Sequence, residues 1–323
     1  MSKSVRYSAQ LGAALVAIVS MISLSACTNA EQLEPEPQVT TKTLKYELFD
    51  LKHRTGDHST PDAVVFIAPG FDQTQPVDLV IYNHGMMNNV SEVVDQWEIE
   101  KQIPLAPPNT VVIMPEWATN PSQLSLEAGD FHKPGFFRAM LTEILSKTPE
   151  LKAVKPDDLN KISIVSYSGG WNATATQIYK NGFEPKIVSV SMFDSLYKGK
   201  ILDPWIEKNL DNFASGKKQY HNFYFHTYPY ALQQLARIKK MIAQKNIQIP
   251  DMIHDTADPK AVMKESRIAD NSIVFKNTMI YDDKFSGHQS TAYVYFPQVL
   301  KSMAIRQEKE LSQVASSEDN KKM

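Results

Sequence analysis

The chain has 323 residues, of which 42% are hydrophobic, and a chain of this length can bury a large core in one domain. Its net charge of −2 and pI near 6.5 provide no basic surface for nucleic acid, so we expect no nucleic-acid partner. The single cysteine, Cys27, excludes an intramolecular disulfide and a thiolate metal cluster.

The N-terminus has the pattern of a secretory signal. Lys3 and Arg6 precede an apolar stretch without charge that is too short to be interpreted first as a membrane span. The motif Leu24-Ser25-Ala26-Cys27 resembles the lipobox of bacterial lipoproteins, which implies cleavage before Cys27 and lipid attachment to its sulfur. An ordinary signal peptide with an incidental cysteine is the alternative. By the usual sorting pattern, Thr28 implies a lipid-anchored protein of the bacterial cell envelope, at the outer membrane.

These features divide the chain into four parts. Residues 1–26 are the expected lipoprotein signal peptide, and residues 27–42 are the lipidated cysteine followed by a polar, flexible tether. Residues 43–306 form the expected globular domain, and residues 307–323 form a charged tail that we expect to fray.

The globular part alternates between strand and helix patterns. Apolar runs predict strands over residues 43–50, 63–67, 77–82, 110–114, 162–165, 186–192, 221–225 and 272–281. Helical spacing predicts helices over residues 90–101, 135–146, 171–179, 205–213, 231–245 and 293–306, and residues 249–266 are expected to be irregular. This order predicts an α/β fold with a mostly parallel central sheet of about eight strands and helices on both faces. Residues 195–218 break the alternation.

A tight turn between one strand and the next helix carries the candidate nucleophile. The strand over residues 162–165 leads into Ser166-Tyr167-Ser168-Gly169-Gly170, and a helix follows. This is the pattern of a nucleophile elbow, in which a strained turn needs small neighbours such as Ser166 and Gly170. Ser168 is therefore the candidate nucleophile. The alternative is that this Ser/Gly-rich segment is an ordinary turn between a strand and a helix, without a catalytic role.

A serine hydroxyl needs an adjacent base. Among the eight histidines, His288 alone lies just after the last predicted strand and before the last predicted helix. Its position after the serine fits the order Ser…Asp…His, so His288 is the candidate base.

The candidate acid is Asp194, at the end of the predicted strand over residues 186–192. The next strand is the commoner place for the acid, but it ends in His226-Thr227 without a carboxylate. Asp194 would hold the imidazole in the right tautomer. A helix N-cap is the competing interpretation of Asp194, and Asp282 and Asp283 are weaker alternatives as the acid.

With these residues in place, the chain resembles the α/β-hydrolase superfamily over residues 43–306. The resemblance rests on His84-Gly85, Ser166-x-Ser168-x-Gly170, Asp194 and Gly287-His288. It departs from the family in having Ser166 as the first elbow residue and the acid one strand early. The resemblance implies acyl transfer to water through an acyl-enzyme on Ser168, without a metal or organic cofactor. It also implies that the insertion over residues 195–218 forms a small cap over the site.

The resemblance also implies an oxyanion hole and a substrate pocket. The amide of Gly169 would supply one donor and that of Met86, after His84-Gly85, the other. The remaining residues that we expect to line the pocket lie at or near the strand ends: His84, Gly85, Met87, Glu116, Trp117, Tyr167, Tyr197 and Trp205.

The sequence thus predicts an envelope-anchored serine hydrolase that cleaves a small-molecule ester or amide, with an ester favoured over a peptide. A non-catalytic binding lipoprotein with the same fold is the alternative. A metal hydrolase is disfavoured because neither His-x-His nor His-Glu-x-x-His spacing occurs, and we expect no metal site.

Overall fold

One mixed sheet runs through the part of the chain that the computed structural model describes. The described residues are 42–46, 52–53, 61–86, 88–117, 129–280, 285 and 287–322. All of them belong to one unit, Val39–Met323. The predicted signal, Cys27 and most of the tether lie outside the described residues, as do Met87, Asp282 and Asp283.

The sheet has nine strands in the described residues, one more than predicted. In chain order they are β1 (Lys42–Tyr46), β2 (Ala63–Ile67), β3 (Asp78–Asn83), β4 (Thr110–Pro115), β5 (Ile162–Tyr167), β6 (Ile187–Phe193), β7 (Gln219–Tyr224), β8 (Met252–Asp255) and β9 (Ile273–Asn277). Their order in the sheet is β1-β2-β4-β3-β5-β6-β7-β9-β8. Strand β2 is antiparallel to β1 and to β4, and all other pairs are parallel. The predicted mostly parallel sheet is confirmed.

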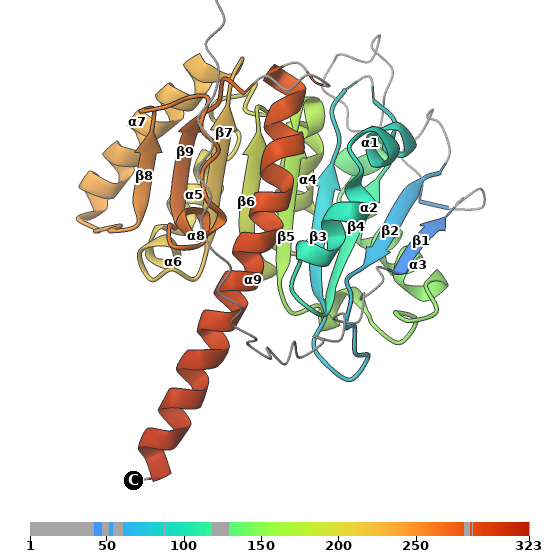
Figure 1. Cartoon of the computed structure of the whole chain (residues 1–323). Coiled ribbons are helices and arrows are strands. Elements are labelled where there is room, and N and C mark those ends of the chain that lie inside the picture. Colours follow the sequence, from blue (N-terminus) through green and yellow to red (C-terminus); the bar gives the residue numbers. More distant parts are fainter. Residues whose placement is uncertain are drawn as a thin grey trace, which may run out of the picture. The chain divides into compact units, whose positions relative to one another are not determined.

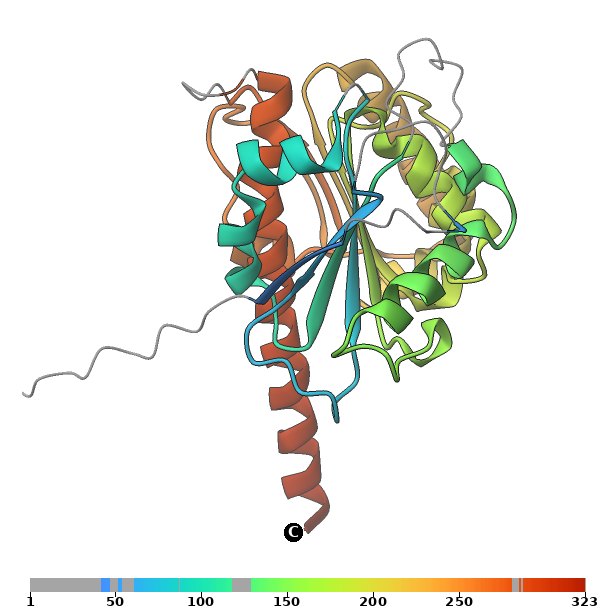
Figure 2. The ribbon, with the colours of Figure 1, turned by 90° about the vertical axis from the view of Figure 1, so that its right-hand side faces the viewer.

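Helices cover both faces of this sheet, also as predicted (Figures 1 and 2). One face carries α3 (Phe136–Lys147), α4 (Trp171–Lys180), α5 (Asp203–Lys208), α6 (Leu210–Ala214) and α7 (Tyr228–Lys245). The other carries α1 (Val90–Gln96), α2 (Ile99–Gln102), α8 (Glu265–Ala269) and α9 (Gly287–Lys322). Short 3₁₀ turns are η1 (Ile103–Leu105), η3 (Gly129–His132), η4 (Pro156–Asp158), η5 (Ser168–Gly170) and η6 (Glu184–Lys186).

The apolar strand runs account for this layering. In β3, Leu79 and Ile81 pack into the core on one face, while Val80 and Tyr82 pack into the core on the other. Successive side chains of a strand point to opposite faces, so a continuous apolar run needs cover on both sides. The strands therefore place their carboxyl ends, where the candidate site residues follow, at one edge of a rigid, doubly covered sheet.

The predicted irregular segment over residues 249–266 instead holds a strand and the start of a helix. Strand β8 pairs with β9 at the edge of the sheet, and its residues Met252 to Asp255 are only partly buried. An edge strand exposed on one side carries polar residues such as His254 and Asp255, so it lacks the apolar run that indicated the other strands.

The last helix is longer at both ends than the predicted range 293–306. Helix α9 begins at Gly287, so that His288 lies in its first turn, and it continues to Lys322 instead of fraying after Arg306. Two contacts join this part of α9 to the rest of the domain: the Arg306 guanidinium donates to the Gly216 carbonyl, and Glu310 pairs with Lys161. None of the helices in the described ranges, α9 included, has the length and apolarity needed to cross a bilayer.

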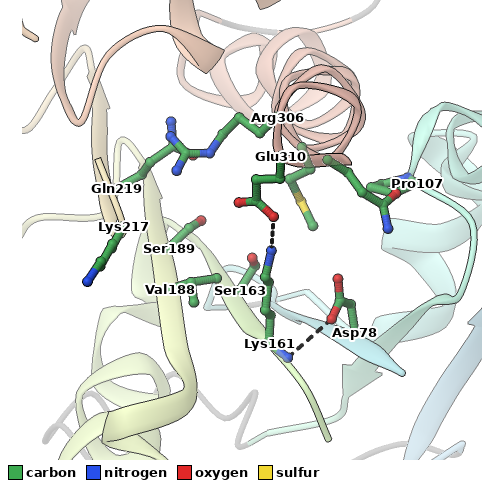
Figure 3. A pocket seen from close by; sticks show the side chains of 12 residues that line it. Asp78, Pro107, Lys161, Ser163, Val188, Ser189, Lys217, Gln219, Arg306 and Glu310 are labelled. Atoms are coloured by element: carbon green, nitrogen blue, oxygen red, sulfur yellow. Dashed lines mark hydrogen bonds and ion pairs between the residues drawn. The ribbon is translucent and has the colours of Figure 1, made fainter. Parts of the chain in front are cut away.

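The pocket drawn in Figure 3 lies where this part of α9 meets the sheet. It is lined by residues at the amino ends of β3 and β5, including Asp78 and Lys161, together with Arg306 and Glu310 of α9. Lys161 is engaged there by two acids, since its backbone N–H donates to Asp78 and its ammonium pairs with Glu310. This pocket is at the opposite strand ends from Ser168, so we treat it as part of the α9 docking contact.

Residues 195–218 form a crossover connection, and the predicted cap over the site is wrong for most of this segment. Its helices α5 and α6 join β6 to β7, and their buried residues Trp205, Ile206, Leu210 and Phe213 belong to the core on one sheet face. The apolar spacing that indicated a helix here serves packing against the sheet. Only the first residues, Ser195 to Tyr197, lie near Ser168.

A buried histidine under α9 makes the stability of the fold depend on pH. His221 of β7 is 1% exposed and its Nδ1 lies 2.9 Å from the Ser191 hydroxyl. Burial, and to a lesser degree the charge of Arg306, lowers the pKa of His221 from 6.5 to about 3. The unfolded chain therefore binds a proton at this residue at a higher pH than the folded chain does.

We expect this residue to destabilise the protein progressively as the pH falls from about 6.5 towards 3. The slope from His221 approaches about 1.4 kcal/mol per pH unit, because protonation favours the unfolded state. Urea unfolding of wild type and His221→Asn at pH 8, 6 and 5 measures it. The variant should lose less stability on acidification than wild type. Equal losses in the two proteins would show that His221 does not carry this dependence.

Candidate active site

Ser168 lies on a strained turn between β5 and α4. Its φ is 48°, in the left-handed region that non-glycine residues rarely adopt, and η5 leads directly from it into the helix. Ser166, which stands where a glycine is usual, is fully buried, and its hydroxyl lies 2.6 Å from that of Ser195. The Ser195 hydroxyl in turn donates to the Ser168 carbonyl at 2.7 Å. The side chains of Ser166 and Ser195 therefore connect the turn to the end of β6.

Gly170 is required by a close approach of two backbones. A Cβ placed on it would lie 2.5 Å from the Asn83 carbonyl oxygen at the end of β3. We expect Gly170→Ala to lower the free energy of unfolding by about 1–3 kcal/mol, because the extra methyl forces the elbow and β3 apart.

The matched control for this substitution is Gly199→Ala. A Cβ at Gly199 meets its nearest neighbours at 3.6 Å, an ordinary contact distance. Chemical denaturation of both variants gives the comparison. A Gly170 variant as stable as the Gly199 variant would contradict the close approach.

The structure brings the three predicted side chains Ser168, His288 and Asp194 together in one hydrogen-bonded chain. His288 Nε2 lies 2.9 Å from the Ser168 hydroxyl oxygen, and His288 Nδ1 lies 2.6 Å from Asp194 Oδ2. The residues come from the end of β5, the first turn of α9 and the end of β6. The imidazole thus has its two nitrogens in two different contacts, one suited to accept a proton from the hydroxyl and the other to donate to the carboxylate.

Asp194 is fully buried and is held by the turn that follows β7. Its Oδ1 accepts hydrogen bonds from the backbone N–H of Phe225 and of Thr227 and from the Thr227 hydroxyl, and its Oδ2 accepts from the N–H of His226. Burial alone would raise the pKa of Asp194, but the hydrogen bonds from His288, Thr227 and Phe225 outweigh it and lower the pKa to about 2. The carboxylate therefore stays ionised throughout the range in which a histidine can act as a base.

The two predicted oxyanion donors lie side by side. A Cβ on Gly169 would lie 2.9 Å from the Met86 nitrogen and 2.8 Å from the Met86 Cβ, so the loop after β3 packs directly on the residue after Ser168. A Cβ on Gly85 would meet the Tyr167 ring at 2.7 Å. These contacts require small residues on both segments and bring the Met86 and Gly169 backbones next to the nucleophile.

Three of the predicted pocket residues, His84, Glu116 and Trp117, pack against one another at the start of this loop. The side chains of His84 and Glu116 are fully buried, with His84 Nε2 3.1 Å from Glu116 Oε1. Trp117 stacks on the His84 ring at 5.3 Å between centroids and donates its indole N–H to the His84 carbonyl. Because His84 and Glu116 are sealed from solvent, they do not line a substrate pocket, and the prediction that they do is wrong.

The aromatic residues predicted for the pocket have three different locations. Tyr167 is buried with its ring 4.9 Å from that of His288, so it supports the base. Tyr197 is partly exposed beside Ser168, and burial and the charge of Asp194 raise the pKa of its hydroxyl. Trp205 is fully buried against Phe213 in the core, so the prediction that it lines the pocket is wrong.

The sequence did not indicate two residues of the turn after β7. Thr227 contributes a backbone and a side-chain hydrogen bond to Asp194, and His226 stacks on His288 with ring centroids 5.2 Å apart. The only available signal was the missing carboxylate at the end of that strand.

Among the described residues, Asp194, His226 and His288 form the group that could hold a metal ion, with one ligand atom from each within 4.8 Å of the others. Both oxygens of Asp194 already accept hydrogen bonds, and His288 bridges to Ser168. An ion bound there would break the Ser168–His288–Asp194 chain, so we assign no metal to it.

Strand order, elbow and residue order together define the fold class. A mostly parallel sheet with an antiparallel strand β2, a serine elbow after β5, and an acid and a histidine that follow in that order are the features of the α/β-hydrolase fold. The chain has this fold.

Comparison with known proteins gives likenesses in structure only. No protein-family model and no curated protein sequence matches the chain. The structure is similar to the feruloyl esterase module from Clostridium thermocellum, with 13% identity, a TM-score of 0.46, and 84% of this chain and 90% of that chain covered. It is also similar to an S-formylglutathione hydrolase from Agrobacterium tumefaciens, with 14% identity, a TM-score of 0.37, and coverage of 76% and 89%.

Proposed function

We propose that the protein is a serine hydrolase that cleaves a carboxylic ester or amide of a small molecule through an acyl-enzyme. The observation that carries this proposal is the chain of contacts from the Ser168 hydroxyl through His288 to Asp194, at 2.9 and 2.6 Å, on a strained elbow. A plain strand-to-helix turn needs neither the strain nor the aligned imidazole.

In the first half of the reaction, the Ser168 oxygen attacks the substrate carbonyl carbon while His288 Nε2 takes its proton. The negative oxygen of the tetrahedral intermediate faces the N–H groups of Gly169 and Met86. When the intermediate collapses, His288 gives its proton to the leaving alcohol or amine, and an ester on Ser168 remains. Asp194 stays ionised and stabilises the imidazolium.

In the second half, water takes the place of the leaving group. His288 removes a proton from the water as the water oxygen attacks the acyl carbon, and returns it to the Ser168 oxygen on collapse. The products are a carboxylic acid and free enzyme. Every proton transfer uses His288 Nε2, the nitrogen that already faces Ser168.

Hydrolysis of p-nitrophenyl esters of increasing acyl length, beside the matching p-nitroanilides, tests the proposal. We expect ester turnover with an initial burst of up to one nitrophenol per protein wherever deacylation is the slower step. Folded protein that turns over none of these compounds would instead favour the non-catalytic binding protein.

We also propose that the protein is anchored in the bacterial envelope through lipid on Cys27. The support is the motif Leu24-Ser25-Ala26-Cys27, which lies outside the described residues. Fractionation of cells that express wild type and Cys27→Ser tests this: wild type should sediment with membranes, and the variant should be released. Equal membrane association of the two would contradict it.

A further inference from the structure

Besides its two hydrogen-bond partners, the His288 imidazole contacts two aromatic rings. The His226 ring lies nearly parallel to it, with 22° between the ring planes and 5.2 Å between the centroids. The Tyr167 ring lies 4.9 Å from it at 37°. The two nitrogens of the imidazole face Ser168 and Asp194. Hydrogen bonds therefore hold the base at its edge, and neighbouring rings contact its flat surface.

The two hydrogen bonds alone leave one motion of the His288 imidazole open. The contacts of Nδ1 and Nε2 are 2.6 and 2.9 Å long, and a tilt of the ring about the line through these nitrogens moves neither of them from its place. Such a tilt does turn the Nε2 lone pair, which lies in the ring plane, away from the Ser168 hydroxyl. Because a hydrogen bond weakens as it bends, the tilt makes the base less effective. A flat neighbour parallel to the imidazole opposes this motion.

His226 is fixed beside the base by its own backbone. Its N–H donates to Asp194 Oδ2 at 2.9 Å, and the same oxygen lies 2.6 Å from His288 Nδ1. The Nδ1 atom of His226 lies 3.9 Å from that oxygen, which is beyond hydrogen-bond distance. The His226 side chain thus meets the catalytic group through the face of its ring and not through a hydrogen bond to the acid.

The exposure of His226 separates this contact from packing of the core. Its side chain is 59% exposed, although it stacks on a base that is 18% exposed. Replacement of a mostly exposed side chain changes the free energy of unfolding little. A loss of rate on replacement of His226 is therefore a property of the site and not of the fold.

We propose that His226 is a positioning residue, whose ring keeps the His288 imidazole in the plane that aligns Nε2 with the Ser168 hydroxyl. The inference rests on the proposed hydrolase function and adds to it a residue that transfers no proton itself. Alignment matters in both halves of the reaction, because the same nitrogen takes and returns every proton. The contact uses the flatness of the His226 ring and not its nitrogens, so a phenyl ring should replace it.

The discriminating variants are His226→Ala and His226→Phe in the full chain. Alanine removes the ring and keeps the backbone hydrogen bond to Asp194, whereas phenylalanine keeps a flat ring without nitrogens. We expect His226→Ala to lower kcat and kcat/KM for a p-nitrophenyl ester equally, by on the order of tenfold. A misplacement of about 1 Å can cost roughly a hundredfold, and here both hydrogen bonds of His288 remain. His226→Phe should stay within about threefold of wild type.

The rate of inactivation by a fluorophosphonate gives a second readout, because this reaction also needs Ser168 activated by His288. It should fall by a similar factor in His226→Ala and recover in His226→Phe, while the unfolding midpoints of both variants agree with wild type. The matched control is His254→Ala, which removes another exposed histidine side chain, from the edge strand β8. Both rates of this control should equal those of wild type.

Two kinds of result would overturn the inference while wild type is active. The first is a His226→Ala variant with wild-type kcat and wild-type inactivation, or one in which only KM rises, which would assign His226 to substrate binding. The second is a His226→Phe variant as slow as His226→Ala, which would show that the ring nitrogens are needed. Inactive wild-type protein would instead overturn the proposed function and this inference with it.

Discussion

Replacing Ser168 by alanine should abolish ester hydrolysis while leaving the fold intact. We expect kcat to fall by roughly 10⁵-fold or more, because no other group in the described site can form the acyl intermediate with His288. The hydroxyl contributes little to stability, since alanine adopts the same left-handed backbone at comparable strain and the buried bonds of Ser166 and Ser195 remain.

The measurement is initial rates with a p-nitrophenyl ester, together with thermal unfolding of both proteins. The unfolding midpoints should agree within a few degrees. Replacement of Ser195 by alanine is the matched control, because it removes a hydroxyl that contacts the same turn without removing the nucleophile. If Ser168→Ala retained a few per cent of wild-type activity, the nucleophile would have to be another residue.

Replacing Asp194 by asparagine should lower kcat by about 10⁴-fold, the second-largest effect that we expect. An asparagine cannot accept the Nδ1 proton of His288 in the same way, so the imidazole loses the tautomer with Nε2 free to act as a base. In the wild-type protein, the backbone N–H groups of Phe225, His226 and Thr227 all donate to the Asp194 carboxylate oxygens. In the variant, the asparagine NH₂ takes the place of one of these acceptor oxygens. We therefore expect some loss of stability as well.

Thr227→Val separates these two consequences. It removes only the hydroxyl contact to Asp194 and leaves the carboxylate and its three backbone hydrogen bonds in place. Its kcat should stay within about tenfold of wild type while its stability falls by about 1 kcal/mol. Asp194→Asn with activity close to that of Thr227→Val would show that Asp194 serves the turn and not the base.

Asp194 could be selected from the sequence as the candidate acid, but its hydrogen-bond partners in the turn after β7 could not be predicted. The two competing interpretations, triad acid and helix cap, both capture part of its surroundings: it binds His288, and it also binds the amides that precede α7. The donors in that turn are backbone N–H groups, which carry no residue identity and leave no pattern in the sequence. The turn after β7 therefore has no carboxylate of its own, and its backbone N–H groups bind the carboxylate of Asp194, at the end of β6.

Alternation of apolar runs and helical spacing was sufficient to predict the sheet, its two covered faces and the edge at which Ser168, Asp194 and His288 meet. The same pattern failed where long-range contacts decide the structure. Helix α9 continues beyond Arg306, and there Glu310 pairs with Lys161, a residue distant in sequence. Trp205, at a position that suggested a pocket wall, is instead needed to fill the core between α5 and α6.

The proposed hydrolysis depends above all on Ser168 as the activated nucleophile. The most direct test is treatment of the folded full-length protein with a fluorophosphonate, followed by mass spectrometry of its peptides. We expect one adduct, on Ser168, in wild type, and none in Ser168→Ala. Folded wild type that remains unmodified, or an equal adduct in the Ser168→Ala variant, would contradict it.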